Sequence, residues 1–297
     1  MFFLPNKNTP ILCQGITSNA GAIHTELAFA YGSHIVACVS AEKIIKTFLN
    51  VPVFHSVKEA IQKTKEQPQV SVIFSTPVHA LKDSIEAIEA HIPLIVCTTE
   101  GVPMHDALKM REKAEQNGVC FIGPSSSGIV CVGETLIGST PAHLFPKGNV
   151  ALVGRSSSLM WEAVEQLKNV GLGVSRYIAL GTDHLIATSF VPVVDALLQD
   201  KETQLILVLG QVHGDLEYEL AAFYKKQKNP KKMWAYIPGR SLEKSDKRPL
   251  LGMKTVKFAD VIDAKKQAFI DAGVYWIDYP DKIGVTIKQH MKDRKNT

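Results

Sequence analysis

Long hydrophobic runs are absent from this sequence of 297 residues. No apolar stretch approaches the roughly 20 residues that a helix needs to cross a bilayer. The apolar start of the chain, Met1 to Leu4, is too short for the core of a signal peptide. We therefore expect a cytoplasmic protein that does not associate with a membrane. Hydrophobic residues make up 45% of the chain and charged residues 21%, which is typical of a globular protein with one large or two ordinary domains.

Cysteine pairs of the CxxC type are also missing. The chain has five cysteines, an odd number, and four of them lie in apolar runs where a cysteine acts as a small hydrophobic residue. We therefore expect reduced thiols and no zinc site. Basic residues are concentrated between 225 and 266, but no nucleic-acid motif accompanies them. A nucleic-acid partner is not expected, and the basic stretch fits either a solvated face or a surface for an anionic ligand.

What the chain does contain is an alternation of strand-length apolar runs and helix-length amphipathic segments. The first half has runs at 11–15, 35–39, 70–74 and 94–97, with helical periodicity at 56–65 and 81–91. The second half restarts with apolar runs at 149–154, 205–210 and 233–237. Buried strands separated by helices predict parallel sheets covered on both faces, and right-handed crossovers make such sheets doubly wound. We expect two doubly wound α/β domains, residues 1–130 and 149–297, joined by a link near 138–148.

Three turns rich in glycine and serine follow expected strands, where open α/β sheets bind their ligands. The first, Gly15 to His24, offers N–H groups to a phosphate at a helix N-terminus, but it lacks the second glycine of the GxGxxG fingerprint. The second, Gly154 to Glu162, contains three serines and the cation of Arg155. The third, Gly123 to Gly128, is a hydroxyl-rich loop bounded by glycines. Each also fits an ordinary role as a strand-to-helix turn, a helix cap or a tight loop.

Together these turns resemble those of the α subunit of succinate–CoA ligase, and the similarity runs almost from end to end. The family's segments G-F-T-G-S-Q-G-T-F-H, A-x-A-Y-G, T-E-G-I-P, G-P-N-C-P-G and S-R-S-G-T-L-T-Y-E correspond to residues 15–24, 28–32, 99–103, 123–128 and 154–162. The order and spacing of so many segments are more specific than any one motif.

The resemblance implies an N-terminal Rossmann-like domain that binds coenzyme A (CoA) and a C-terminal flavodoxin-like domain. It also implies a β-subunit partner of the ATP-grasp type, with a homo-oligomer as the alternative. By position, the CoA site would be lined by Thr17, Ser18, Asn19, Ala20, Lys43, Thr98, Thr99 and Glu100. The phosphate or substrate side in the second domain would comprise Arg155, Ser156, Ser157, Ser158 and Trp161.

The chain departs from the family where phosphoryl transfer takes place. The family's phosphorylated histidine, in G-H-A-G-A, aligns without a gap to Leu250, which has no nucleophilic atom. The glutamate that orients this histidine is replaced by Gln211, whose neutral amide cannot stabilise an imidazolium as a carboxylate does. The family turn G-I-G-G-D-P has become Ala179 to His184, and Trp161 stands in place of a tyrosine. We therefore expect a CoA-binding protein whose phosphohistidine relay is lost.

Two other functions stay open. One is an active acid–thiol ligase subunit with a different phosphoryl carrier, for which His184 and His213 are the candidates because each follows an expected strand of the second domain. The other is a different CoA-dependent acyltransferase that forms no phosphoenzyme. Lys244, Lys247 and Arg248 suit an anionic substrate for such an enzyme, and they suit a plain surface loop equally well.

Overall fold

A computed structural model describes residues 2–41, 45–239 and 258–292 of the chain. The expected site positions Lys43 and Leu250, and the basic residues Lys244, Lys247 and Arg248, lie outside the described residues. Within these residues the strands form two seven-stranded sheets. The first sheet, in spatial order, consists of β3 (Thr47–Phe48), β4 (Val51–Phe54), β2 (Ile35–Val39), β1 (Ile11–Gln14), β5 (Val70–Ile73), β6 (Leu94–Cys97) and β7 (Cys120–Ile122). The second consists of β14 (Tyr275–Trp276), β13 (Lys232–Tyr236), β12 (Leu205–Leu209), β10 (Lys147–Gly154), β11 (Val174–Ala179), β8 (Gly128–Cys131) and β9 (Thr135–Gly138).

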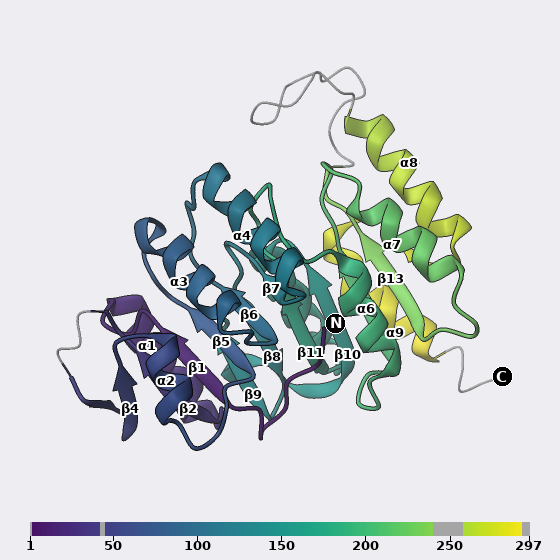
Figure 1. Cartoon of the computed structure of the whole chain (residues 1–297). Coiled ribbons are helices and arrows are strands. Elements are labelled where there is room, and N and C mark those ends of the chain that lie inside the picture. The colour runs from purple at the N-terminus through teal and green to yellow at the C-terminus, as the bar shows by residue number, and fades with distance from the viewer. Residues whose placement is uncertain (1, 42–44, 240–257, 293–297) are drawn as a thin grey trace.

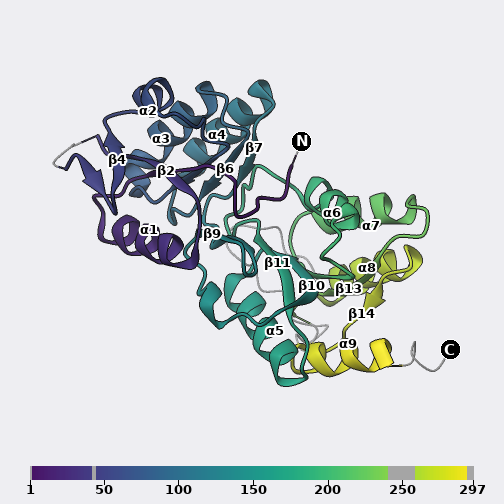
Figure 2. The ribbon, with the colours of Figure 1, turned by 90° about the horizontal axis from the view of Figure 1, so that it is seen from below.

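Helices connect these strands and cover both faces of each sheet (Figure 1). The helices are α1 (Asn19–Tyr31), α2 (Val57–Lys63), α3 (Pro77–Glu89), α4 (Met104–Asn117), α5 (Ser157–Asn169), α6 (Phe190–Gln199), α7 (Leu216–Lys225), α8 (Phe258–Asp271) and α9 (Ile283–Lys292), with short 3₁₀ turns η1 (Ala142–Leu144) and η2 (Pro280–Lys282). Seen from below, α1 lies on one face of the first sheet and α2, α3 and α4 on the other, while α5 and α9 lie opposite α6, α7 and α8 across the second sheet (Figure 2).

The sequence produces this arrangement because its central strands are apolar on both sides. All residues of β1 are buried, and neighbouring side chains enter different cores. Leu12 packs in the core under α2, α3 and α4, whereas Cys13 packs in the core that continues into the second sheet. The first sheet is parallel except for its edge strand β3, and the second is parallel except for β8 and β9. The expected fold of two doubly wound α/β sheets is confirmed.

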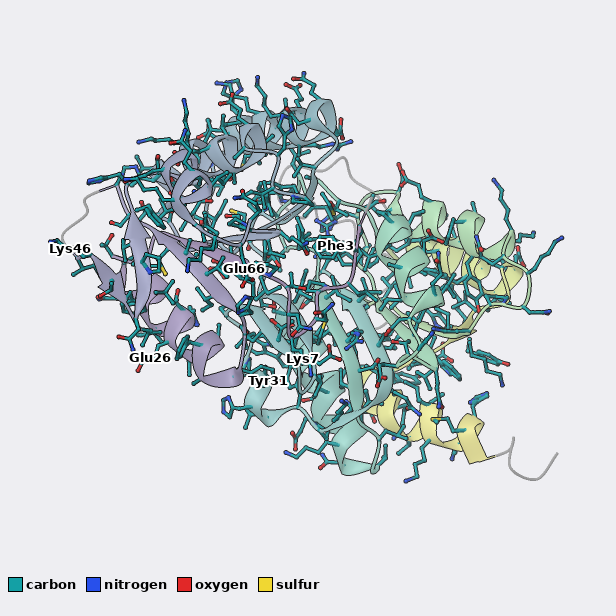
Figure 3. The ribbon with its side chains drawn as sticks, turned by 60° about the horizontal axis from the view of Figure 1, so that its bottom comes forward. Phe3, Lys7, Glu26, Tyr31, Lys46 and Glu66 are labelled. Carbon is teal, nitrogen blue, oxygen red and sulfur yellow. The ribbon has the colours of Figure 1, made fainter. Side chains whose placement is uncertain are left out.

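The hairpin of β8 and β9 joins the two halves of the molecule. It extends the second sheet, because β8 pairs antiparallel with β11. In the sequence, however, the hairpin begins within the segment 1–130, and most of it lies between that segment and 149–297. The Ser33 hydroxyl, just after α1, donates to the Leu136 carbonyl and accepts from the Leu136 N–H, each at 2.8 Å. The Tyr31 hydroxyl, at the end of α1 (Figure 3), accepts from the Gly133 N–H at 2.9 Å. Strands of both sheets therefore contribute to one continuous hydrophobic core across this junction. The division at residues 130 and 149 stays a prediction.

Among the described residues, no helix is both long enough and apolar enough to cross a membrane.

Candidate functional site

A cavity of about 580 Å³ opens at the carboxyl ends of the central strands of the first sheet. We call it the first-domain cavity. Four connections line it: the turn between β1 and α1 (Gly15, Thr17, Ser18), the end of β2 (Ser40, Ala41), the start of α2 (His55, Ser56) and the segment from β5 into α3 (Ser75, Thr76, His79, Lys82, Asp83, Glu86). Ligands bind at this edge of open α/β sheets because the helix N-termini and the strand ends meet there.

The turn after β1 is shaped by glycines and by the cap of α1. Gly15 has φ +80°, which favours glycine, and a Cβ on Gly21 would lie 2.2 Å from the Gly15 carbonyl oxygen. The Ser18 hydroxyl caps the helix, because it accepts from the Gly21 N–H at 2.9 Å and donates to the Gly15 carbonyl at 2.9 Å. The first turn of α1 thus lies tightly against the strand end, and its free N–H groups are available to an anion.

The structure brings some of the expected CoA residues into the cavity and leaves others beside it. Thr17 and Ser18 line it, and the Thr17 hydroxyl accepts from Ser40 at 3.3 Å. Asn19 and Ala20 are the first two residues of α1, both exposed, and they are not among the lining residues. A contact of each residue with CoA stays a prediction.

Thr98, Thr99 and Glu100 follow β6 and also lie outside the cavity lining. The Thr98 hydroxyl donates to the Ile73 carbonyl at 2.8 Å, and the buried Thr99 hydroxyl donates to the Ser75 carbonyl at 2.7 Å. These bonds fix the end of β5 and the following residue Ser75, and Ser75 does line the cavity, so the two threonines support its wall from outside. Glu100 is exposed.

Sequence reasoning missed the wall that α3 contributes. Asp83 accepts a short hydrogen bond from the Ser75 hydroxyl, and its backbone carbonyl accepts from the Gln14 amide at 3.1 Å. Burial raises the pKa of the Asp83 carboxyl, against the opposing effect of the Ser75 hydrogen bond, and burial also raises the pKa of Glu86. The only sequence signal for this wall is a group of polar residues one turn apart at the start of the helix after β5. Such a group looks like the solvated face of any amphipathic helix.

In the second domain, the serine-rich turn forms a regular helix start. Ser156 caps α5 by accepting from the Leu159 N–H at 3.4 Å, and Ser157 and Ser158 are the first residues of that helix. Trp161, further along α5, is 38% exposed. The capping serine fits its ordinary role, while the N-terminus of α5 keeps the N–H groups that an anion would use.

Arg155 does not point freely toward this helix start. Its guanidinium is buried, and it donates to the Gly181 carbonyl at 3.2 Å and, through a short hydrogen bond, to the Asp183 carbonyl. Burial lowers the pKa of Arg155, and the carboxylates of Glu217 and Asp183 oppose that change. The arginine therefore stabilises the loop that follows β11.

The loop Gly210–Gly214, which we call the Gln211 loop, rests on a buried ion pair. Lys265 of α8 is fully buried and donates to Glu217 at 2.6 Å, to the Gln211 carbonyl at 2.9 Å and to the His213 carbonyl at 3.4 Å. The other Glu217 oxygen accepts from the Gln211 N–H at 2.8 Å. Sequence reasoning missed both charges, because a lysine or glutamate in an amphipathic helix reads as exposed.

Two polar atoms in the Gln211 loop, Oε1 of Gln211 and Nε2 of His213, are buried and have no hydrogen-bond partner among the residues that the structure describes. The rings of His184 and His213 lie side by side, with centroids 5.3 Å apart. Burial, followed by the positive charges of Arg155, His184 and Lys265, lowers the pKa of His213 to about 4, so this imidazole is neutral at pH 7. No group of three or more histidine, cysteine, aspartate or glutamate side chains in the described residues can hold a metal ion.

The turn Gly123–Gly128 lies between the two regions. The Ser125 N–H donates to the Thr99 carbonyl at 2.9 Å, and the Ser125 hydroxyl lies 2.6 Å from that of Thr182. The buried Ser126 hydroxyl donates to the Ala179 carbonyl at 2.5 Å. This turn therefore connects the end of β6 in the first sheet to the end of β11 in the second.

Comparison with known proteins agrees with this two-part organisation. Residues 6–101 match the profile of the family described as "CoA binding domain", and residues 147–284 match the "Succinyl-CoA ligase like flavodoxin domain". The fold and this pair of domains define a CoA-binding protein of the ligase type.

Similarity over the whole chain narrows the class to one family. The sequence is 33% identical to the succinate–CoA ligase [ADP-forming] subunit alpha of Aquifex aeolicus, over 98% of this chain and 95% of the relative. It is 38% identical to the subunit alpha 2 of Archaeoglobus fulgidus, over 80% and 82%, and 30% identical to the malate–CoA ligase subunit alpha of Methylorubrum extorquens, over 97% of both. The chain belongs to the succinate–CoA ligase α-subunit family, as the sequence motifs predicted.

Solved structures with the same fold are larger proteins. ATP citrate lyase from Methanothrix soehngenii, solved with citrate and coenzyme A, superposes with a TM-score of 0.81 at 24% identity, over 96% of this chain and 50% of that one. The dinucleotide-forming acetyl-coenzyme A synthetase 1 of Ca. Korarchaeum cryptofilum gives a TM-score of 0.72 at 15% identity, over 92% and 58%. This chain thus spans about half the length of those chains, and the likeness shows the shared fold.

Proposed function

We propose that this protein binds CoA in the first-domain cavity and acts beside a β subunit of the ATP-grasp type, without carrying a phosphohistidine itself. The observation that carries the proposal is the cavity of about 580 Å³ at the N-terminus of α1, within the segment that matches the CoA-binding family. Its glycine and hydroxyl residues suit a nucleotide diphosphate, and its size suits a small-molecule ligand.

The chemistry of the turn explains how CoA would be held. The free N–H groups at the start of α1 and the helix dipole favour the diphosphate, which carries the negative charge nearest to the middle of the ligand. The Thr17 hydroxyl is exposed in the cavity and can donate a further hydrogen bond, while Ser18 is already used in capping the helix. Ser18 therefore contributes mainly by fixing the shape of the turn.

The loss of the relay is supported by the residues at the family's reaction positions. Leu250, by alignment, supplies no phosphate acceptor. The relay would need an orienting carboxylate at this position, whereas Gln211 offers an amide whose oxygen has no donor within residues 2–41, 45–239 and 258–292. Arg155 is committed to two carbonyl groups and so is not free to bind a phosphoryl group.

The names of the relatives support a partner subunit, because they are called alpha subunits of succinate–CoA and malate–CoA ligases. This protein would then supply the CoA site to the assembly. Any activity would then depend on a phosphoryl carrier elsewhere. Without such a carrier, the protein would serve as a CoA-binding module.

Calorimetric titration with CoA tests the first half of the proposal. Wild-type protein should bind one CoA per chain, and both Thr17→Val and Lys43→Ala should weaken binding. The matched control is Thr47→Val, a substitution on the edge strand β3 outside the cavity lining. Absence of saturable CoA binding by the wild type would remove the proposal.

Labelling tests the second half. The protein is incubated with γ-³²P-labelled ATP and an ATP-grasp β subunit, beside an α subunit that has the phosphorylated histidine as the positive control. We expect label on the control and none on this chain. Covalent label on this chain would contradict the loss of the relay.

A second candidate function is an active ligase subunit in which His184 or His213 carries the phosphoryl group. The observation in its favour is the pairing of the two rings 5.3 Å apart in the region that Arg155 braces. Its prediction is an acid-labile label on the wild type that disappears in His184→Gln or His213→Gln, whereas the proposed function predicts no label on any of them.

A further inference from the structure

Among the described residues that line the first-domain cavity there is one lysine, Lys82 on α3, and no arginine. Within the part of the chain that the structure describes, its ammonium group forms no ion pair and no hydrogen bond. His79 precedes it by three residues, so the two side chains occupy the same face of α3, and both line the cavity. This wall thus presents uncommitted donors to the cavity.

The same wall also carries two carboxyl groups, Asp83 and Glu86. Lys82 and His79 are close enough to Asp83 to act on its titration, although burial dominates. A phosphate entering here would meet both carboxyl groups, and Lys82 is the group that offsets their repulsion. Without Lys82 the α3 wall would oppose an anionic ligand.

CoA carries phosphate in two places, the diphosphate in the middle and the 3′-phosphate on the ribose. The N-terminus of α1 accounts for one of them, because free N–H groups and the helix dipole converge there. The α3 wall is a separate part of the cavity with its own donors, so it can hold the other while the first remains on α1.

We propose that Lys82, assisted by His79, binds the 3′-phosphate of CoA and so makes the cavity select CoA over dephospho-CoA. This rests on the proposed CoA-binding function and names a phosphate contact on α3 in addition to the turn after β1. The lysine acts as a point charge on a flexible stem, which suits a phosphate at the mouth of a cavity.

The experiment compares the affinity of the full chain for CoA and for dephospho-CoA by calorimetry, in wild type, Lys82→Ala and Lys82→Arg. The matched control is Lys109→Ala, an exposed lysine on the neighbouring helix α4 that does not line the cavity. For a partly exposed ion pair we expect Lys82→Ala to weaken CoA binding about fivefold and to leave dephospho-CoA binding unchanged. Lys82→Arg should keep the preference for CoA, and Lys109→Ala should behave as wild type.

Equal weakening of both ligands by Lys82→Ala, or no weakening of either, would overturn the assignment of Lys82 to the 3′-phosphate. Failure of the wild type to bind CoA at all would instead overturn the proposed function. A second readout is salt: the preference of the wild type for CoA over dephospho-CoA should shrink as ionic strength rises, because screening weakens an exposed charge pair. A preference that is independent of salt would also count against Lys82.

Discussion

The ion pair between Lys265 and Glu217 offers the sharpest test of how the second domain is held together. Both side chains are almost fully buried, with 0% and 1% of their surface exposed, and the ammonium and carboxylate are 2.6 Å apart. Replacing Lys265 with methionine keeps much of the side-chain volume but leaves the Glu217 carboxylate without its cation. It also leaves the carbonyl groups of Gln211 and His213 without their donor.

Removal of one partner of a buried ion pair costs about 3–5 kcal/mol, because the remaining charge stays desolvated. The next residue provides a matched control, since Lys266 pairs with Asp278 at 2.8 Å while 30% and 42% of the two side chains are exposed. For such a surface pair the expected cost of Lys266→Met is below about 1 kcal/mol. Two adjacent lysines on α8 should therefore differ severalfold in their effect on the free energy of unfolding.

Urea unfolding followed by tryptophan fluorescence measures the difference. The three tryptophans, Trp161, Trp234 and Trp276, all lie in the second half of the chain, so the signal reports the sheet that contains the pair. The double variant Lys265→Met, Glu217→Gln should recover part of the loss, because it removes the stranded charge. If Lys265→Met costs no more than Lys266→Met, the reasoning that a stranded buried carboxylate dominates is wrong.

Two further predictions concern the pH dependence of stability and the turn after β1. The pKa of His213 is lowered to about 4, so between pH 6.5 and 4 the unfolded chain binds a proton that the folded chain does not. The free energy of unfolding should therefore fall as the pH falls across this window, by about 1 kcal/mol after allowance for partial exposure. His213→Asn should remove this contribution from the tryptophan-monitored unfolding curves, and identical pH profiles for variant and wild type would refute it. Gly21→Ala should weaken CoA binding by about tenfold, because its Cβ would meet the Gly15 carbonyl at 2.2 Å and push α1 off the turn. Ala30→Ser, at an exposed position near the far end of α1 and outside the cavity lining, is the control, and equal CoA affinities of the two variants in calorimetry would contradict the expectation.

The α/β architecture was predictable because its strands are apolar on both faces and are separated by helices. The strand β12, Leu205–Leu209, is buried at every position, and such a run is readable without knowing its neighbours. The pairing of β8 with β11 was not readable, because antiparallel partners distant in sequence leave no local pattern. Gly128 illustrates the limit: the sequence shows a glycine, but only the structure shows that a Cβ there would meet the Ile137 carbonyl at 2.0 Å.

The candidate site likewise has a part that the sequence predicted and a part that it did not. The turn from Gly15 to Ser18 was recognisable, because glycine and a capping serine after a buried strand have a local structural meaning. Lys82 and Lys265 were not recognisable, because a lysine on an amphipathic helix carries no sign of whether it faces solvent, a cavity or a buried carboxylate. Tertiary packing, which decides between these environments, leaves one of them at a cavity and buries the other completely.

The two regions are connected through the turn at 123–128, and this connection bears on what the second domain contributes to the proposed CoA site. Ser125 bonds to Thr99 on one side and contacts Thr182 on the other, and Thr99 in turn supports the Ser75 wall of the first-domain cavity. A CoA-binding cavity that is held through these bonds would keep its shape only while the second domain stays folded. The loop bonds made by Arg155 and Lys265 would then serve the CoA site by stabilising the domain, even without phosphoryl transfer. Lys265→Met should accordingly weaken CoA binding only at urea concentrations or temperatures where the second sheet begins to unfold.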